Sequence, residues 1–128
     1  MISPKSSVHK KARIGKDVVI GDFCVVGENV ELGDGCNLIN SVNIQGHTKI
    51  GKKNIFFPFC SIGTLPQDLK FKGEKSYLEI GDNNSFREYS NISVGTEHGG
   101  FITKIKNNNL FMVGSHIGHD CKLGNNLV

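Results

Sequence analysis

Aliphatic residues or phenylalanine recur at every sixth position along the chain. The series runs from Ile2 to Ile62 without a miss, resumes at Ile80 after an interruption, and resumes again at Ile105 after a second one. A period of six matches neither the 3.6-residue period of an α-helix nor the simple alternation of a β-strand. It predicts a short strand and a turn, repeated, with three such units closing one triangular coil. Because a single coil cannot bury its apolar edge alone, the coils are expected to stack into a solenoid.

A second inward position follows four residues after each member of this series, and mostly small or β-branched residues occupy it. All four cysteines of the chain fall there, namely Cys24, Cys36, Cys60 and Cys121. Four cysteines are also compatible with two disulfides or with a zinc site. The phase of the repeat favours small packing residues in a narrow interior instead. Cys121 is therefore not predicted to be a nucleophile, although it adjoins His119 and Asp120.

Two segments interrupt the series. Residues 64–79, TLPQDLKFKGEKSYLE, fill the gap between Ile62 and Ile80, and their length predicts a loop that replaces about one coil of repeats. Around residues 94–104, VGTEHGGFITK, the series loses its register once. Loops that leave a rigid scaffold often carry function. We therefore expect chemistry near these two segments.

Composition narrows the classes of function. A length of 128 residues suggests one domain. The net charge of +3, without a block of basic residues, is too small to predict a nucleic-acid partner. Apolar runs stay below transmembrane length, and the N-terminal residues lack the apolar core of a secretory signal. These observations predict a protein of the cytoplasm that does not span a membrane.

The segment HIGHDC, residues 116–121, combines residue types that can bind metal or transfer protons. A neutral histidine suits general-base work because its unperturbed pKa of about 6.5 lies near neutral pH. A neighbouring carboxylate can fix the histidine tautomer and stabilise the imidazolium. His116, His119 and Asp120 flank or lie between the inward positions Ile117 and Cys121, so the phase of the repeat places them outside the core. An isolated histidine on such a wall would more often be a solvated surface residue.

The pattern [Ile/Leu/Val]-Gly-x-x-[small]-x resembles the hexapeptide repeat of left-handed parallel β-helix acyltransferases. Five segments narrow the match: GHTKIG (46–51), PQDLKF (66–71), IGDNNSFRE (80–88), GTEHGG (95–100) and NLFMVGSHIGHDC (109–121). Together and in this order they resemble the UDP-N-acetylglucosamine O-acyltransferases of lipid A biosynthesis. The resemblance implies an all-β, left-handed parallel β-helix with two inserted loops over residues 1–128. It also implies a fragment that lacks further coils and a helical C-terminal domain.

The implied reaction moves a 3-hydroxyacyl group from acyl carrier protein to the 3-hydroxyl of UDP-N-acetylglucosamine, the first step of lipid A synthesis. By resemblance, His119 is the general base and Asp120 its helper. The resemblance places five further residues in the substrate site: Gln67, Asp68, Lys70, His116 and Ser93. Ser93 stands where the best-known family members have a histidine, so a substrate contact there is lost or passes to a hydroxyl. No metal or cofactor is implied, and the assembly is expected to be a homotrimer in the cytoplasm of a Gram-negative bacterium.

Three other functions stay open at this point. A trimeric β-helix carbonic anhydrase would need three zinc-binding histidines, and only His47 or His98 could join His116 and His119. Another sugar-nucleotide acyltransferase, such as the N-acyltransferase of the same pathway, would carry an extra N-terminal domain, whereas this repeat begins almost at Met1. A purely structural solenoid would not need the QDLK and HIGHD segments. The 128-residue piece alone is expected to be inactive.

Overall fold

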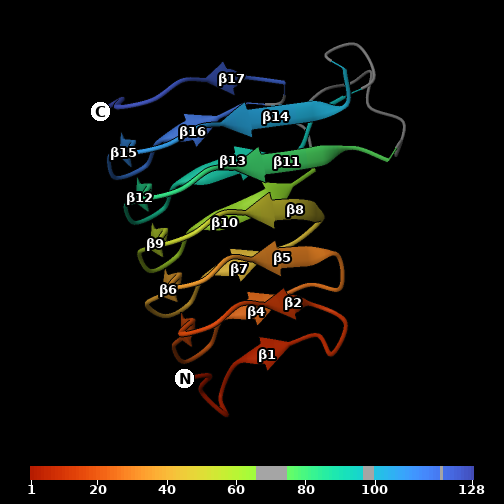
Figure 1. Cartoon of the computed structure of the whole chain (residues 1–128), viewed down its shortest axis with the longest axis vertical. Coiled ribbons are helices and arrows are strands. Elements are labelled where there is room, and N and C mark those ends of the chain that lie inside the picture. Colours follow the sequence, from red (N-terminus) through yellow and green to blue (C-terminus); the bar gives the residue numbers. More distant parts are fainter. Residues whose placement is uncertain (66–74, 97–99, 119) are drawn as a thin grey trace.

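The computed structural model describes residues 1–65, 75–96, 100–118 and 120–128, and these form three parallel β-sheets that wind around one core (Figure 1). The β1 sheet contains, in spatial order, β1 (Ser7–Val8), β4 (Val25–Val26), β7 (Asn43–Ile44), β10 (Ser61–Thr64), β13 (Asn91–Ser93) and β16 (His116–Ile117). The β2 sheet contains β2 (Arg13–Ile14), β5 (Val30–Leu32), β8 (His47–Ile50), β11 (Tyr77–Ile80), β14 (Ile102–Ile105) and β17 (Lys122–Leu123). The β3 sheet contains β3 (Val19–Ile20), β6 (Asn37–Leu38), β9 (Ile55–Phe56), β12 (Ser85–Phe86) and β15 (Leu110–Phe111).

Each coil contributes one strand to each sheet, and the next coil lies directly above it. Val26 therefore pairs with Ile44, and Ile44 pairs with Ile62, in unbroken parallel register. Backbone hydrogen bonds run along the solenoid axis, as from the N–H of Gly27 to the carbonyl oxygen of Ile44 at 2.9 Å. Like side chains 18 residues apart consequently stack above one another. Each coil consists of three similar strand-and-turn units, one for each sheet, so the sequence repeats with a period of six.

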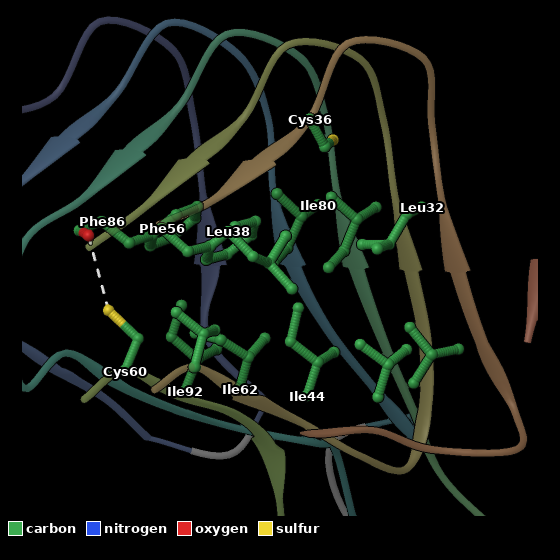
Figure 2. Packing of buried hydrophobic residues seen from close by; sticks show 14 of the residues in the cluster. Leu32, Cys36, Leu38, Ile44, Phe56, Cys60, Ile62, Ile80, Phe86 and Ile92 are labelled. Carbon is green, nitrogen blue, oxygen red and sulfur yellow. Dashed lines mark hydrogen bonds between the residues drawn. The ribbon is translucent and has the colours of Figure 1, made fainter. Parts of the chain in front are cut away.

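The interior confirms both predicted inward positions. Members of the six-residue series such as Leu38, Ile44 and Ile62 are fully buried, and Figure 2 shows them packed side by side in the core. The aromatic members extend the layering, because Phe86 stacks on Phe56 with ring centroids 4.8 Å apart and on Phe111 at 4.9 Å. Such stacked aromatic pairs stabilise a core beyond the area that they bury.

The cysteines behave as the repeat predicts. Cys24, Cys36 and Cys60 are free and fully buried, and Cys121 is a free, partly buried thiol that packs against the core. The Cys60 thiol donates a hydrogen bond to the carbonyl oxygen of Arg87 at 3.1 Å and a longer one to that of Phe86 (Figure 2). Burial raises the pKa of the Cys60 thiol to about 11. This thiol is therefore poorly suited to act as a nucleophile near neutral pH.

An internal ladder of asparagines was not predicted. Asn54, Asn84 and Asn109 occupy the second inward position of successive coils and are each at most 2% exposed. The Asn84 N–H donates to Oδ1 of Asn54 at 2.8 Å, and the Asn109 N–H donates to Oδ1 of Asn84 at 2.9 Å. Nδ2 of Asn84 donates to the carbonyl oxygen of Lys106 at 2.8 Å. Asn109 follows two further asparagines in the sequence, yet its side chain lies in the interior.

The first interruption is an insertion at a corner and does not replace a coil, so that prediction was wrong. Ile50 of β8 pairs directly with Ile80 of β11, just as Leu32 pairs with Ile50. The first pair is 30 residues apart and the second 18, yet both span one coil. Ile62 lies in the β1 sheet and Ile80 in the β2 sheet. The extra residues therefore leave and rejoin the solenoid between β10 and β11.

Candidate functional site

One corner of the solenoid collects both interruptions and the HIGHDC segment. This corner joins strands of the β1 sheet to strands of the β2 sheet, on the right of Figure 1. The first interruption joins β10 to β11, the second joins β13 to β14, and residues 118–121 join β16 to β17. Segments far apart in sequence are thus carried on successive coils of the same corner.

His116 is exposed on the outer face of β16, as the repeat predicts. Its Nδ1 lies 3.2 Å from Oδ1 of Asn91, which is the register partner of His116 on β13. An amide oxygen can only accept, so this contact favours the tautomer with hydrogen on Nδ1 and leaves the Nε2 lone pair available. A Cβ atom placed on Gly118 would lie 3.8 Å from Nε2, so this edge of the ring is directed over the backbone of the turn.

Asp120 is anchored on both its backbone and its side chain. Its φ of 64° lies in the left-handed region, which residues other than glycine seldom occupy. The Asp120 N–H donates to the Thr103 hydroxyl at 2.8 Å. The Thr96 N–H donates to Oδ1 of Asp120 at 2.5 Å, and the Thr96 hydroxyl donates to Oδ2. The carboxylate therefore faces the second interruption, a contact that the sequence gave no reason to expect.

Of the remaining predicted site residues, the structure describes Ser93 alone. Ser93 ends β13 but is only 1% exposed, and its hydroxyl lies 3.5 Å from that of Thr64. A substrate contact by Ser93 would need the surrounding side chains to open, and the contact stays a prediction. Gln67, Asp68, Lys70 and His119 lie outside the described residues. The flanks of the QDLK segment, which are described, place its two ends at the same corner as residues 118–121.

A groove of about 390 Å³ lies on the outer face of the β2 sheet, beside this corner. His47 and Tyr77, paired in register on β8 and β11, form its aromatic side, with ring centroids 5.4 Å apart. Arg13, Glu31 and Lys49 add a row of alternating charge from one coil to the next. Tyr77 was missed in the sequence analysis because it lies inside the first interruption.

The carbonic anhydrase alternative would need a cluster of zinc ligands. Among the residues that the structure describes, no three histidine, cysteine, aspartate or glutamate side chains gather into a candidate metal site. His47 lies on the β2 sheet and His116 on the β1 sheet, so the two side chains belong to different walls.

Within the described ranges, no helix has the length and apolar character needed to span a bilayer.

Comparison with known proteins identifies relatives for the whole described solenoid. Residues 11–46 match the family model for bacterial transferase hexapeptide repeats (six repeats). An acyl-[acyl-carrier-protein]–UDP-N-acetylglucosamine O-acyltransferase of Rickettsia bellii is 50% identical over 122 residues, which is 95% of this chain and 43% of the relative. The enzyme of the same name from Akkermansia muciniphila is 54% identical over 121 residues, covering 94% of this chain and 46% of the relative.

Solved structures agree with these sequence matches. The LpxA structure from Acinetobacter baumannii superimposes with a TM-score of 0.95 at 43% identity, covering 97% of this chain and 48% of that chain. A UDP-N-acetylglucosamine acyltransferase from Bacteroides fragilis gives a TM-score of 0.96 at 45% identity, covering all of this chain and 50% of that one. This agreement confirms the predicted left-handed parallel β-helix. The chain spans less than half the length of the curated relatives that it matches.

Proposed function

We propose that the protein is a UDP-N-acetylglucosamine O-acyltransferase, because its sequence and fold resemble those of the relatives with that name. It would transfer a 3-hydroxyacyl group from acyl carrier protein to the 3-hydroxyl of UDP-N-acetylglucosamine. The observation that carries the proposal is the meeting of three segments at one corner. The interruption that contains QDLK, the interruption that contains GTEHGG and the turn that contains HIGHDC all join the β1 sheet to the β2 sheet. Loops gathered at one edge of a rigid scaffold form a typical site for catalysis.

The chemistry requires removal of one proton and departure of one thiolate. The sugar hydroxyl attacks the thioester carbonyl, the C–O bond forms as the C–S bond breaks, and the thiolate of the carrier takes up a proton. His119 accepts the hydroxyl proton as general base, and Asp120 orients the ring and stabilises the imidazolium. A positioned base of this kind contributes roughly 10²–10⁴-fold in rate. Residues 67, 68 and 70 would bind the nucleotide sugar from the neighbouring interruption.

His116 has a separate role in this proposal. Its Nδ1 is directed to Oδ1 of Asn91 at 3.2 Å, which leaves Nε2 as an acceptor at the exposed edge of the β1 sheet. An acceptor there suits a sugar or ribose hydroxyl of the nucleotide substrate. This arrangement supports a binding role for His116, whereas the proton-transfer role proposed for His119 rests on the family resemblance.

Assembly and location belong to the same proposal. The three sheets form the walls of the solenoid, and such walls suit side-by-side packing of three copies, with a groove between neighbours that draws residues from two chains. We expect a homotrimer in the cytoplasm of a Gram-negative bacterium, where acyl carrier protein and UDP-N-acetylglucosamine are both present. Sedimentation analysis of the protein expressed from its whole gene would test the trimer.

The experiment on function compares the parent protein with His119→Ala, each expressed from the whole gene. Transfer from 3-hydroxyacyl carrier protein to UDP-N-acetylglucosamine is measured across several acyl lengths, and circular dichroism checks that both proteins are folded. We expect transfer by the parent and a loss of at least about 10²-fold in the variant. A folded parent that transfers no acyl group would refute the proposal, and zinc content and other sugar nucleotides would be tested next.

A further inference from the structure

The Thr96–Asp120 contact joins two segments that the six-residue repeat does not relate. Thr96 follows β13 at the stem of the second interruption, and Asp120 follows β16 on the next coil. Both carboxylate oxygens of Asp120 accept from this one residue, one from the backbone N–H and the other from the hydroxyl. A two-point contact fixes the plane of a carboxylate as well as its position, which a single hydrogen bond cannot do.

Thr96 is itself held rigidly. It is 1% exposed, and its carbonyl oxygen accepts from the N–H of Phe101 at 2.6 Å, which closes the stem of the interruption. Tyr77 forms backbone hydrogen bonds on both sides of this interruption. Its N–H donates to the carbonyl oxygen of Phe101 at 2.7 Å, and its carbonyl oxygen accepts from the N–H of Gly95 at 3.1 Å. Thr96 therefore presents its two donors to Asp120 from a fixed frame.

The anchored carboxylate still has capacity for another donor. An ionised carboxylate offers about four lone-pair sites on its two oxygens, and Thr96 uses one on each. A histidine N–H can bind one of those that remain. The backbone of Asp120 is held independently, through its N–H on the hydroxyl of Thr103, which is fully buried. Thr96 thus controls the side-chain orientation of Asp120, whereas Thr103 controls the path of the turn.

We propose that Thr96 is a positioning residue of the acyl-transfer site, which fixes the Asp120 carboxylate in the orientation that serves the general base. The inference rests on the proposed function, because it assigns Thr96 a role only through Asp120. A threonine that merely tied the interruption to the solenoid would affect stability or substrate affinity. A threonine that acts through Asp120 affects the rate of the chemical step.

The test measures kcat and KM for both substrates in the protein expressed from its whole gene. Thr96→Val removes the hydroxyl at nearly constant volume, and Thr96→Ser keeps it. Thr48→Val is the matched control, since Thr48 is equally buried and its hydroxyl donates to a backbone group, the carbonyl oxygen of Gln45, at 2.7 Å. We expect Thr96→Val to lower kcat roughly ten- to a hundredfold with each KM within about twofold. Thr96→Ser should restore kcat to within about threefold of the parent, and Thr48→Val should leave it unchanged.

A double-mutant cycle with Asp120→Asn separates a positioning role from a structural one. If Thr96 acts through Asp120, Thr96→Val lowers kcat no further once Asp120 is replaced, because coupled residues are not additive. Additive losses, an effect confined to KM, or equal losses in Thr96→Val and Thr48→Val would each overturn the inference. Should Thr96→Val not fold, Thr96→Ala replaces it in the same cycle. A parent without acyl transfer refutes the proposed function and the inference with it, whereas an active parent with an unaffected Thr96→Val refutes the inference alone.

Discussion

The side-chain oxygen of Asn54 accepts a hydrogen bond from the backbone N–H of Asn84 at 2.8 Å, and so links the interiors of two consecutive coils. Asn84 repeats the same contact with Asn109 in the coil above, at 2.9 Å. A buried polar group contributes stability only while its partners are present, and it is costly when one is removed. The asparagine ladder should therefore respond sharply to replacement of its middle member.

Replacing Asn84 by Ala removes two side-chain contacts and leaves the N–H of Asn109 and the carbonyl oxygen of Lys106 without their partners. Each buried group left unpaired costs about 1–3 kcal/mol, so we expect the free energy of unfolding to fall by about 2–5 kcal/mol. Urea denaturation followed by circular dichroism measures the change. Asn37→Ala, at an outward position of β6, is the control and should change it by less than about 0.5 kcal/mol. Equal effects of the two substitutions would contradict a role for the ladder.

Phe86 lies between two aromatic neighbours in the core, with ring centroids 4.8 and 4.9 Å from those of Phe56 and Phe111. Phe86→Ala should lower the free energy of unfolding by about 3–5 kcal/mol, because it removes buried area and leaves a cavity. Phe86→Leu should cost less, since much of the volume is kept. Phe23, at a corner, is 65% exposed, and its replacement by Ala serves as the surface control. A cost for Phe86→Ala below about 1 kcal/mol would show that the stack adds little.

Thiol accessibility should follow the positions of the four cysteines. Cys121 is partly buried, whereas Cys24, Cys36 and Cys60 are fully buried. Burial raises the pKa of each of these three thiols, in Cys60 to about 11. At pH 8 we expect the native protein to label first at Cys121 with a thiol-specific reagent, and the other three only on unfolding. Mass spectrometry after proteolysis would identify the labelled thiols, and early labelling at Cys60 would refute the assignment.

The same thiols predict an alkaline loss of stability. In the unfolded chain a thiol ionises near pH 9, whereas Cys60 in the folded chain keeps its proton up to a pH of about 11. Between these values the folded state binds more protons than the unfolded state, so the free energy of unfolding falls as pH rises. Chemical denaturation between pH 8 and about 11 measures the slope. Cys60→Ala should make the slope shallower, and an unchanged slope would exclude Cys60 as its source.

Asn91 should influence substrate affinity through His116. Its Oδ1 lies 3.2 Å from Nδ1 of His116, and loss of this contact frees the ring to rotate or to change tautomer. In the acyl-transfer assay we expect Asn91→Ala to raise KM for UDP-N-acetylglucosamine about three- to tenfold, with a smaller change in kcat. Asn43, which occupies the corresponding wall position two coils below, provides the control as Asn43→Ala. A change in KM for the acyl carrier alone would contradict the role given to His116.

The repeat predicted the architecture because it constrains every coil equally. The positions of Ile44, Ile62 and Cys60 in the core follow from their phase, and the structure confirms them. Asn54 and Asn84 share that phase, but their polarity concealed it, since a buried asparagine looks like a turn residue until its partners one coil away are known. The insertion between β10 and β11 was misread because the distance from Ile62 to Ile80 in the sequence equals the length of one coil. The two residues lie in different sheets, however, so this distance does not correspond to one full coil.

The site was predictable only in part, for a related reason. The outward position of His116 follows from the repeat, and the structure confirms it. The contact of Asp120 with Thr96 spans an interruption of irregular length, so no periodic rule connects the two residues. Thr96 and Asp120 therefore meet where the repeat gives no information.

Because both interruptions lie at one corner, the length of a corner segment can vary independently of the packing of the interior. A segment inserted between β10 and β11 can have any length that returns the chain to Tyr77 in pairing position with His47, because the coil beneath is defined by that pairing and not by the number of residues. Segments at this corner can therefore be exchanged while the coils that carry them stay the same. Grafting a corner segment from a relative onto this solenoid should therefore change substrate preference without requiring any change in the packing of the interior.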